Sequence, residues 1–101
     1  MNQIIITYEN EIKALCKKHQ VKNLFVFGSI LTNRFNDQSD IDFLVSFNNV
    51  PLLDFADNYL SFCESLEKIL GRKVQIVVES SIRNPFFKSE LDKTKQILFA
   101  A

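Results

Sequence analysis

Two aspartates separated by one residue are the strongest chemical signal in this sequence. Asp40 and Asp42 lie in an otherwise apolar segment, although strands seldom hold aspartate in their interior. Alternate side chains of a strand point to the same side, so both carboxylates should share one face and leave Ile41 and Phe43 on the buried face. Two neighbouring carboxylates repel each other unless a cation lies between them, and such hard oxygen ligands suit magnesium. The pair therefore predicts a Mg²⁺ site.

A Gly-Ser pair earlier in the chain favours this interpretation over that of two solvated acids on an edge strand. Gly28 and Ser29 end an apolar run, and they supply a backbone turn and a hydroxyl where a phosphate could approach. Ser39 comes directly before the acids and can hydrogen-bond the turn into the strand. Arg34 is close enough to reach the same phosphates, with a solvated surface arginine as the alternative. Together these residues predict a site for a metal-bound nucleoside triphosphate.

The elements that would position this site follow from hydrophobic periodicity and from turn residues. A helical stripe covers residues 7–20, with Thr7 as its cap, and the long helix over residues 52–70 begins after Pro51 and stops at Gly71. A short helical turn with Ser29 as N-cap is expected over residues 29–34, and a last helix should begin at Asn84-Pro85 and end near residue 92. Strands are predicted over residues 22–27, 41–47 and 73–79, with a final extended segment over residues 96–99. This order predicts an α/β (α+β) fold with a small mixed sheet of three to four strands flanked by helices.

Size and composition agree with one domain over residues 1–101. The chain has 101 residues, 47% of them hydrophobic, which suffices for one modest core. Its 12 basic and 12 acidic residues balance, so no net field attracts nucleic acid or membrane. Neither a signal peptide nor an apolar stretch of the ~20 residues that span a bilayer is visible. Cys16 and Cys63 lack metal-type spacing and fall on apolar helix faces. We therefore expect a cytoplasmic protein with reduced cysteines.

The motifs resemble those of a known family. They are Gly28-Ser29, then residues 30–39, then Asp40-Ile41-Asp42, and later Gly71-Arg72-Lys73-Val74 before a strand. This pattern resembles the minimal nucleotidyltransferases of the polymerase-beta-like superfamily over nearly the whole chain. The resemblance implies the nucleotidyltransferase fold. It also implies that Asp40 and Asp42 are catalytic and hold Mg²⁺, and that ATP is the substrate.

The resemblance also implies a partner and a reaction. Minimal nucleotidyltransferases are typically encoded beside a small helical protein of the HEPN type, often as the antitoxin of a toxin–antitoxin pair. Some of them transfer AMP from ATP to a tyrosine of that partner. For a chain too short to carry its own acceptor domain, the acceptor is expected to be supplied in trans. The sequence leaves a homo-oligomer open.

Two departures from the family pattern leave a second function open. Family members usually carry a third carboxylate where this chain has Gln75, whose amide cannot accept a proton at pH 7. Glu79 is four residues further on, roughly 13 Å away at strand rise, which is too far to substitute. The family often has an arginine shortly after the Gly-Ser pair, and here Leu31, Thr32 and Asn33 follow. The alternative is therefore a catalytically impaired, binding-only module that neutralises or assembles with a helical partner.

Overall fold

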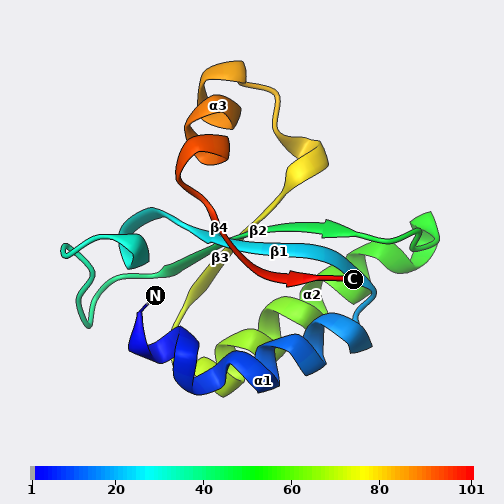
Figure 1. Cartoon of the computed structure of the whole chain (residues 1–101). Coiled ribbons are helices and arrows are strands. Elements are labelled where there is room, and N and C mark those ends of the chain that lie inside the picture. The colour runs from blue at the N-terminus through cyan, green and yellow to red at the C-terminus, as the bar shows by residue number, and fades with distance from the viewer. Residues whose placement is uncertain (1) are drawn as a thin grey trace.

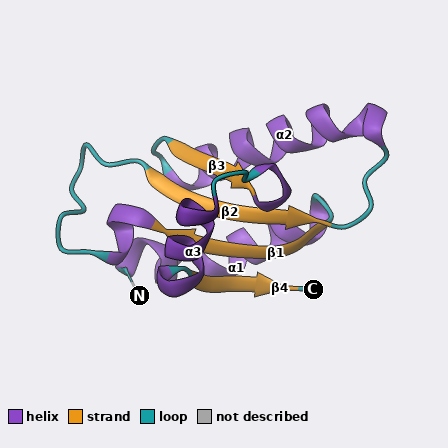
Figure 2. Cartoon of the chain, turned by 90° about the horizontal axis from the view of Figure 1, so that it is seen from above, coloured by secondary structure: helices purple, strands orange, loops and turns teal. Residues whose placement is uncertain are grey.

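Four strands form one mixed sheet in the order β3-β2-β1-β4 (Figures 1 and 2). The computed structural model describes residues 2–101. The central strand β1 pairs antiparallel with β2 and with β4, whereas β2 and β3 run parallel. This sheet confirms the predicted fold class. The strands are β1 (Val21–Phe27), β2 (Ile41–Phe47), β3 (Val74–Val78) and β4 (Gln96–Ala100).

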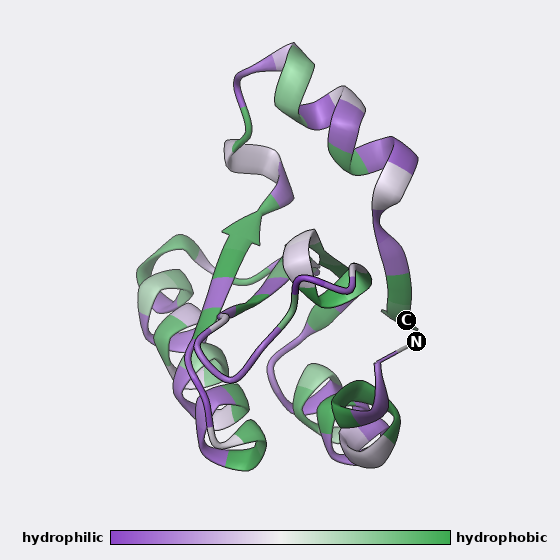
Figure 3. Ribbon diagram, turned by 90° about the vertical axis from the view of Figure 1, so that its left-hand side faces the viewer, coloured by the Kyte–Doolittle hydropathy of each residue, from purple (hydrophilic) through white to green (hydrophobic). Residues whose placement is uncertain are grey.

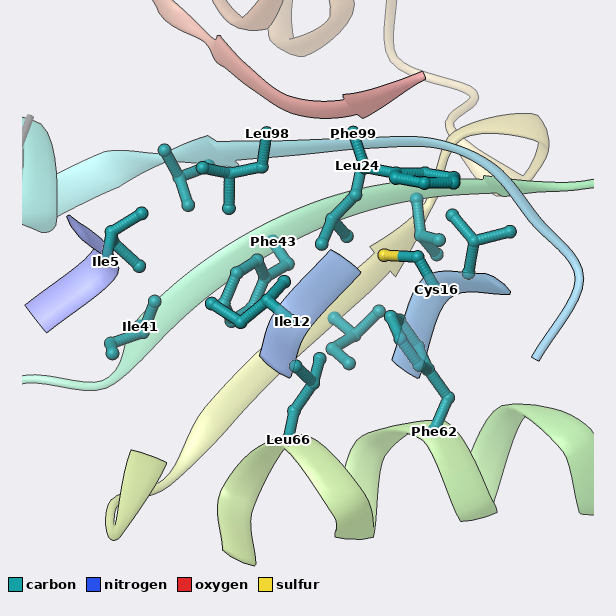
Figure 4. Packing of buried hydrophobic residues seen from close by; sticks show 14 of the residues in the cluster. Ile5, Ile12, Cys16, Leu24, Ile41, Phe43, Phe62, Leu66, Leu98 and Phe99 are labelled. Atoms are coloured by element: carbon teal, nitrogen blue, oxygen red, sulfur yellow. The ribbon is translucent and has the colours of Figure 1, made fainter. Parts of the chain in front are cut away.

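Two helices, α1 (Gln3–Lys18) and α2 (Leu52–Leu70), cover one face of the sheet (Figures 1 and 3). Ile41, Phe43 and Val45 of β2 point into the core between this face and the helices. Because side chains alternate along a strand, Asp42 projects from the opposite face. Figure 4 shows the packing of this core, whose labelled members are Ile5, Ile12, Cys16, Leu24, Ile41, Phe43, Phe62, Leu66, Leu98 and Phe99.

The first helix begins four residues earlier than predicted. Asn2, and not Thr7, is its N-cap, and the Asn2 Oδ1 accepts a hydrogen bond from the Ile4 N–H at 2.8 Å. The sequence did not indicate this turn, because residues 4–6 are β-branched and such residues favour strands. Ile5 nevertheless continues the buried stripe of Ile12 and Cys16 at helical spacing, and this burial outweighs local propensity.

The second helix has the predicted bounds, and side chains tie it to its neighbours. Gly71 ends it in the left-handed conformation, with φ of 66°, as a glycine C-cap does. The Tyr59 hydroxyl donates to the Ile76 carbonyl at 2.8 Å and so joins α2 to the edge strand β3. At the end of α1, His19 is buried: its Nδ1 donates to the Leu15 carbonyl and its Nε2 lies 3.0 Å from the Ser61 hydroxyl. His19 therefore links α1 to α2.

The third helix, α3 (Pro85–Thr94), lies on the other side of the sheet from α1 and α2 (Figures 1 and 3). Asn84 caps it by accepting hydrogen bonds from the Phe86 and Phe87 N–H groups. The Phe87 ring meets Phe27 of β1 edge-on, with 6.2 Å between ring centroids. A short 3-10 helix, η2 (Glu79–Ser81), precedes α3 and begins at the last residue of the predicted third strand. None of the helices in residues 2–101 is long and apolar enough to cross a membrane.

Candidate functional site

The Gly-Ser turn and the second aspartate meet at one end of the sheet. Phe27, the last residue of β1, is the cross-strand partner of Asp42. Gly28 follows with φ of 79°, a left-handed conformation that side chains rarely adopt. A Cβ atom at this position would collide with Oδ2 of Asp42, so the carboxylate lies directly against the glycine backbone. The glycine is required both by its backbone conformation and by the space that Asp42 occupies.

The two aspartates differ in their environment. Asp42 is half-buried in β2, whereas Asp40 is exposed and precedes the strand, which begins at Ile41. The strand begins at Ile41, as predicted, so Asp40 lies just before it and only Asp42 lies within it. Burial raises the pKa of Asp42, and the nearby charge of Asp40 raises it further. A cation bound at the pair would relieve this repulsion.

Gln75, where the family resemblance led us to expect a third acid, lies beside Asp42 in the sheet. In the parallel ladder of β2 and β3, Gln75 is the register partner of Asp42. Residues Phe27, Asp42 and Gln75 thus form a row across three neighbouring strands, on the face opposite to α1 and α2. Glu79 lies beyond the end of β3, in η2, although the strand was predicted to reach residue 79. Gln75 therefore brings a neutral amide, and no carboxylate, to the strand position next to Asp42.

Two other predicted nucleotide-binding residues, Ser29 and Arg34, make no hydrogen bond to the acid pair in the described part of the chain. Ser29 lies in the 3-10 helix η1 (Gly28–Leu31), which is shorter than predicted, and no side-chain hydrogen bond caps its start. The Ser29 carbonyl instead accepts from the Thr32 N–H at 2.9 Å and from the Thr32 hydroxyl at 2.8 Å. Arg34 is exposed, and its guanidinium makes no hydrogen bond or ion pair within residues 2–101. The structure brings Gly28 against Asp42 but gives Arg34 no such contact.

Arg72 makes contacts next to the acid pair that the sequence analysis did not predict. Arg72 is half-buried, and it donates from Nη1 to the Ser39 carbonyl at 3.1 Å and to the Asn36 carbonyl at 3.4 Å. Its guanidinium also lies over the Phe35 ring, 4.6 Å from the centroid. Backbone carbonyls more than thirty residues away leave no trace in sequence spacing, so only its place in the Gly71-Arg72-Lys73-Val74 motif could have indicated it.

The donor set fits a hard divalent cation that also binds phosphate. Carboxylate, amide and hydroxyl oxygens are the groups available from Asp40, Asp42, Gln75 and Ser29. Within residues 2–101 no group of three or more His, Cys, Asp or Glu side chains gathers to enclose a metal. Two carboxylates are what Mg²⁺ commonly takes from a protein when water and substrate phosphates complete its shell. The pair therefore suits a metal that arrives with a triphosphate.

A cavity lies away from the acid pair. It has a volume of about 510 Å³ and opens at the far end of β2, between Ser46, Phe55 of α2, Glu79 and Lys88 of α3. The Ser46 hydroxyl on its wall is buried and has no hydrogen-bond partner among the described residues. Asp42 and Ser46 are four residues apart on one strand, roughly 13 Å at strand rise. The acid pair thus lies at the other end of β2, separate from this cavity.

The fold, with its left-handed glycine turn and two aspartates at one end of the sheet, matches a known class of proteins. The nucleotidyltransferase domain family matches residues 9–98, and the chain belongs to this family. A protein of Methanocaldococcus jannaschii, provisionally named a protein adenylyltransferase, is 38% identical over 94 residues, covering 83% of this chain and 91% of that protein. The protein adenylyltransferase MntA of Thermococcus cleftensis is 33% identical over 79 residues, covering 78% of this chain and 77% of its own. These relatives confirm membership of the minimal nucleotidyltransferases.

Solved structures show the same fold. One that is provisionally identified as a minimal nucleotidyltransferase superposes with a TM-score of 0.78 at 25% identity and covers 95% of both chains. A second is a Shewanella oneidensis complex of a tri-AMPylated HEPN toxin with an MNT antitoxin, with a TM-score of 0.65, 18% identity, and coverage of 95% of this chain and 72% of that chain. At this identity the second likeness concerns the fold.

Proposed function

We propose that this chain binds Mg²⁺ and ATP at the acid pair and transfers AMP to a hydroxyl group of a HEPN-type helical partner, as the antitoxin of a toxin–antitoxin pair. The observation that carries the proposal is the contact between Asp42 and the Gly28 turn, with Asp40 next to them. The turn presents backbone to phosphate where the carboxylates would hold the metal. The named adenylyltransferase relatives support AMP as the transferred group. The proposal also places the chain in the cytoplasm, where ATP is available.

The reaction is an in-line displacement at the α-phosphorus of ATP. The acceptor oxygen forms a bond to phosphorus, the bond to the bridging oxygen breaks, and pyrophosphate leaves with the electron pair. Bound Mg²⁺ would supply neutralisation of the phosphate charge. Asp40 and Asp42 would hold the metal, and Gly28 and Ser29 would orient the phosphates. The acceptor proton passes to solvent, because Gln75 cannot take it at pH 7.

A binding-only module is the second candidate, and Gln75 favours it. The amide beside Asp42 removes one charge and one proton acceptor from the site. Loss of a general base commonly slows a reaction by ~10²–10⁴. Such a chain would still bind the triphosphate and could neutralise its partner by contact alone.

One assay separates the two candidates. The protein is incubated with ATP labelled in the α-phosphate, with MgCl₂ and with the helical protein encoded beside it. Label on the partner that is lost with Asp42→Asn supports transfer. A complex that forms normally without label would reject the enzyme and retain the binding module.

The Gln75→Asp variant tests the third position. It places a carboxylate beside Asp42, and we expect transfer to rise by ~10²–10⁴ because the site regains a proton acceptor. The rate of label incorporation measures this. Gln75→Asn is the matched control, since it keeps a neutral amide and should leave the rate unchanged. Equal rates for both variants would show that Gln75 is not the defect.

A further inference from the structure

The position of Asp40 depends on the backbone around it. Asp40 is exposed, and its carboxylate makes no hydrogen bond or ion pair within residues 2–101. On its C-terminal side, the Ile41 N–H donates to the Lys73 carbonyl at 3.2 Å, where the ladder with β3 begins. On its N-terminal side the chain leaves the sheet. Whatever holds residues 36–39 therefore also places Asp40.

Residues 36–39 form a turn that is closed by its own hydrogen bonds. The Ser39 N–H donates to the Asn36 carbonyl at 3.0 Å, and the Asn36 N–H donates to the Ser39 hydroxyl at 3.1 Å. The Gln38 N–H donates to Oδ1 of Asn36 at 2.8 Å. These bonds fix the shape of the turn, but they do not attach it to the rest of the molecule.

Arg72 supplies that attachment. Its Nη1 reaches the carbonyls of Asn36 and Ser39, and its guanidinium lies over Phe35, which packs against the main core. The Ser39 carbonyl belongs to the peptide bond that leads into Asp40. A planar guanidinium can bond and stack at the same time, which the ammonium of lysine cannot do.

We propose that Arg72 is a positioning residue that clamps the 36–39 turn to the sheet and thereby holds Asp40 beside Asp42. Arg72 acts on the metal site without contacting it, as outer groups that orient metal ligands do. The inference rests on the proposed function as far as the pair binds a metal. The neighbouring cation Lys73 is exposed and makes no side-chain hydrogen bond within residues 2–101, so it offers an internal comparison.

Two measurements on the full chain test the clamp. The first is the Mn²⁺ dissociation constant, from electron paramagnetic resonance titration, for the wild type, Arg72→Ala, Arg72→Lys and Lys73→Ala. We expect Arg72→Ala to weaken binding by ~10–100-fold, the usual cost of losing an outer partner of a metal ligand. Arg72→Lys should recover little of this loss, and Lys73→Ala should bind as the wild type does.

The second measurement is amide hydrogen exchange of residues 36–41 without metal. Arg72→Ala and Arg72→Lys should speed exchange in this segment and leave β1 unchanged, whereas Lys73→Ala should not. Unchanged exchange in both Arg72 variants, or Mn²⁺ affinity within twofold of the wild type, would overturn the clamp. If the wild type binds no Mn²⁺, the proposed function fails, and the exchange data alone decide the role of Arg72.

Discussion

At the scale of single residues, Asp42 lies in an environment that disfavours its charge. Burial and the neighbouring Asp40 raise its pKa above the ordinary 3.8, so the folded state binds the proton more tightly than the unfolded chain does. Asp42 therefore favours folding fully below the unfolded pKa, and this contribution is lost as the pH rises through the raised folded pKa. At neutral pH the ionised side chain reduces the stability of the metal-free protein.

The Asp42→Asn variant should accordingly be more stable than the wild type at neutral pH without metal. The difference should shrink in the acid range, where the wild-type carboxyl is protonated, and Mg²⁺ should raise the melting temperature of the wild type only. Thermal unfolding across pH, with and without Mg²⁺, measures both effects. Asp37→Asn is the control, because Asp37 is exposed in the adjacent loop. A variant less stable than the wild type at neutral pH would contradict this prediction.

At the scale of elements, two glycines with the same backbone conformation have different surroundings. Gly28 has φ of 79° and lies against Asp42, whereas Gly71 has φ of 66° and a Cβ there would meet nothing within 4 Å. Each position disfavours a side chain by roughly 1–2 kcal/mol through the left-handed conformation. Only at Gly28 would the added atom also displace the carboxylate.

The pair Gly28→Ala and Gly71→Ala separates strain from function. We expect both to lower the free energy of unfolding by at least ~1 kcal/mol, in urea titrations, because of the left-handed backbone. Only Gly28→Ala should also weaken Mn²⁺ and ATP binding in equilibrium titrations. Equal binding by the two variants would show that the contact with Asp42 does not shape the site.

The elements that could be predicted are those whose ends are marked by proline or glycine. The bounds of β2 and α2 agree with the prediction because Pro51 and Gly71 interrupt periodic apolar segments. The start of α1 was missed because its first turn is β-branched. For the site, the sequence indicated which residue types carry the chemistry. Their mutual placement depends on strand register and on Arg72, whose partners are distant backbone carbonyls.

At the scale of the whole molecule, one face of the sheet forms the core and the other carries the candidate site. Helices α1 and α2 bury one face in the core. Asp42 projects from the other face, and α3 lies on that side of the sheet (Figure 1). A partner that brings a hydroxyl to the acid pair must approach on the side of α3. Apolar side chains also lie outside this face, since Leu52 and Leu53 at the start of α2 are 89% and 94% exposed.

Hydrogen exchange with and without the helical partner tests this direction of approach. We expect the partner to slow exchange in α3 and in residues 28–40, because these segments border the acid pair. Lowered exchange at residues 52–60 alone would place the partner on the outer side of α2, away from the proposed reaction. The Asp42→Asn variant, which should retain the complex, serves to separate docking from catalysis.

The buried thiol of Cys16 can report on local opening of the core. Burial raises the pKa of its thiol to about 12, and alkylating reagents react with the thiolate. Cys16 is thus labelled only in those molecules whose first helix has come away from the core. The rate of Cys16 alkylation therefore measures how often this helix opens. A lower rate after nucleotide is added would show that a ligand at the acid pair also stabilises the opposite face of the sheet.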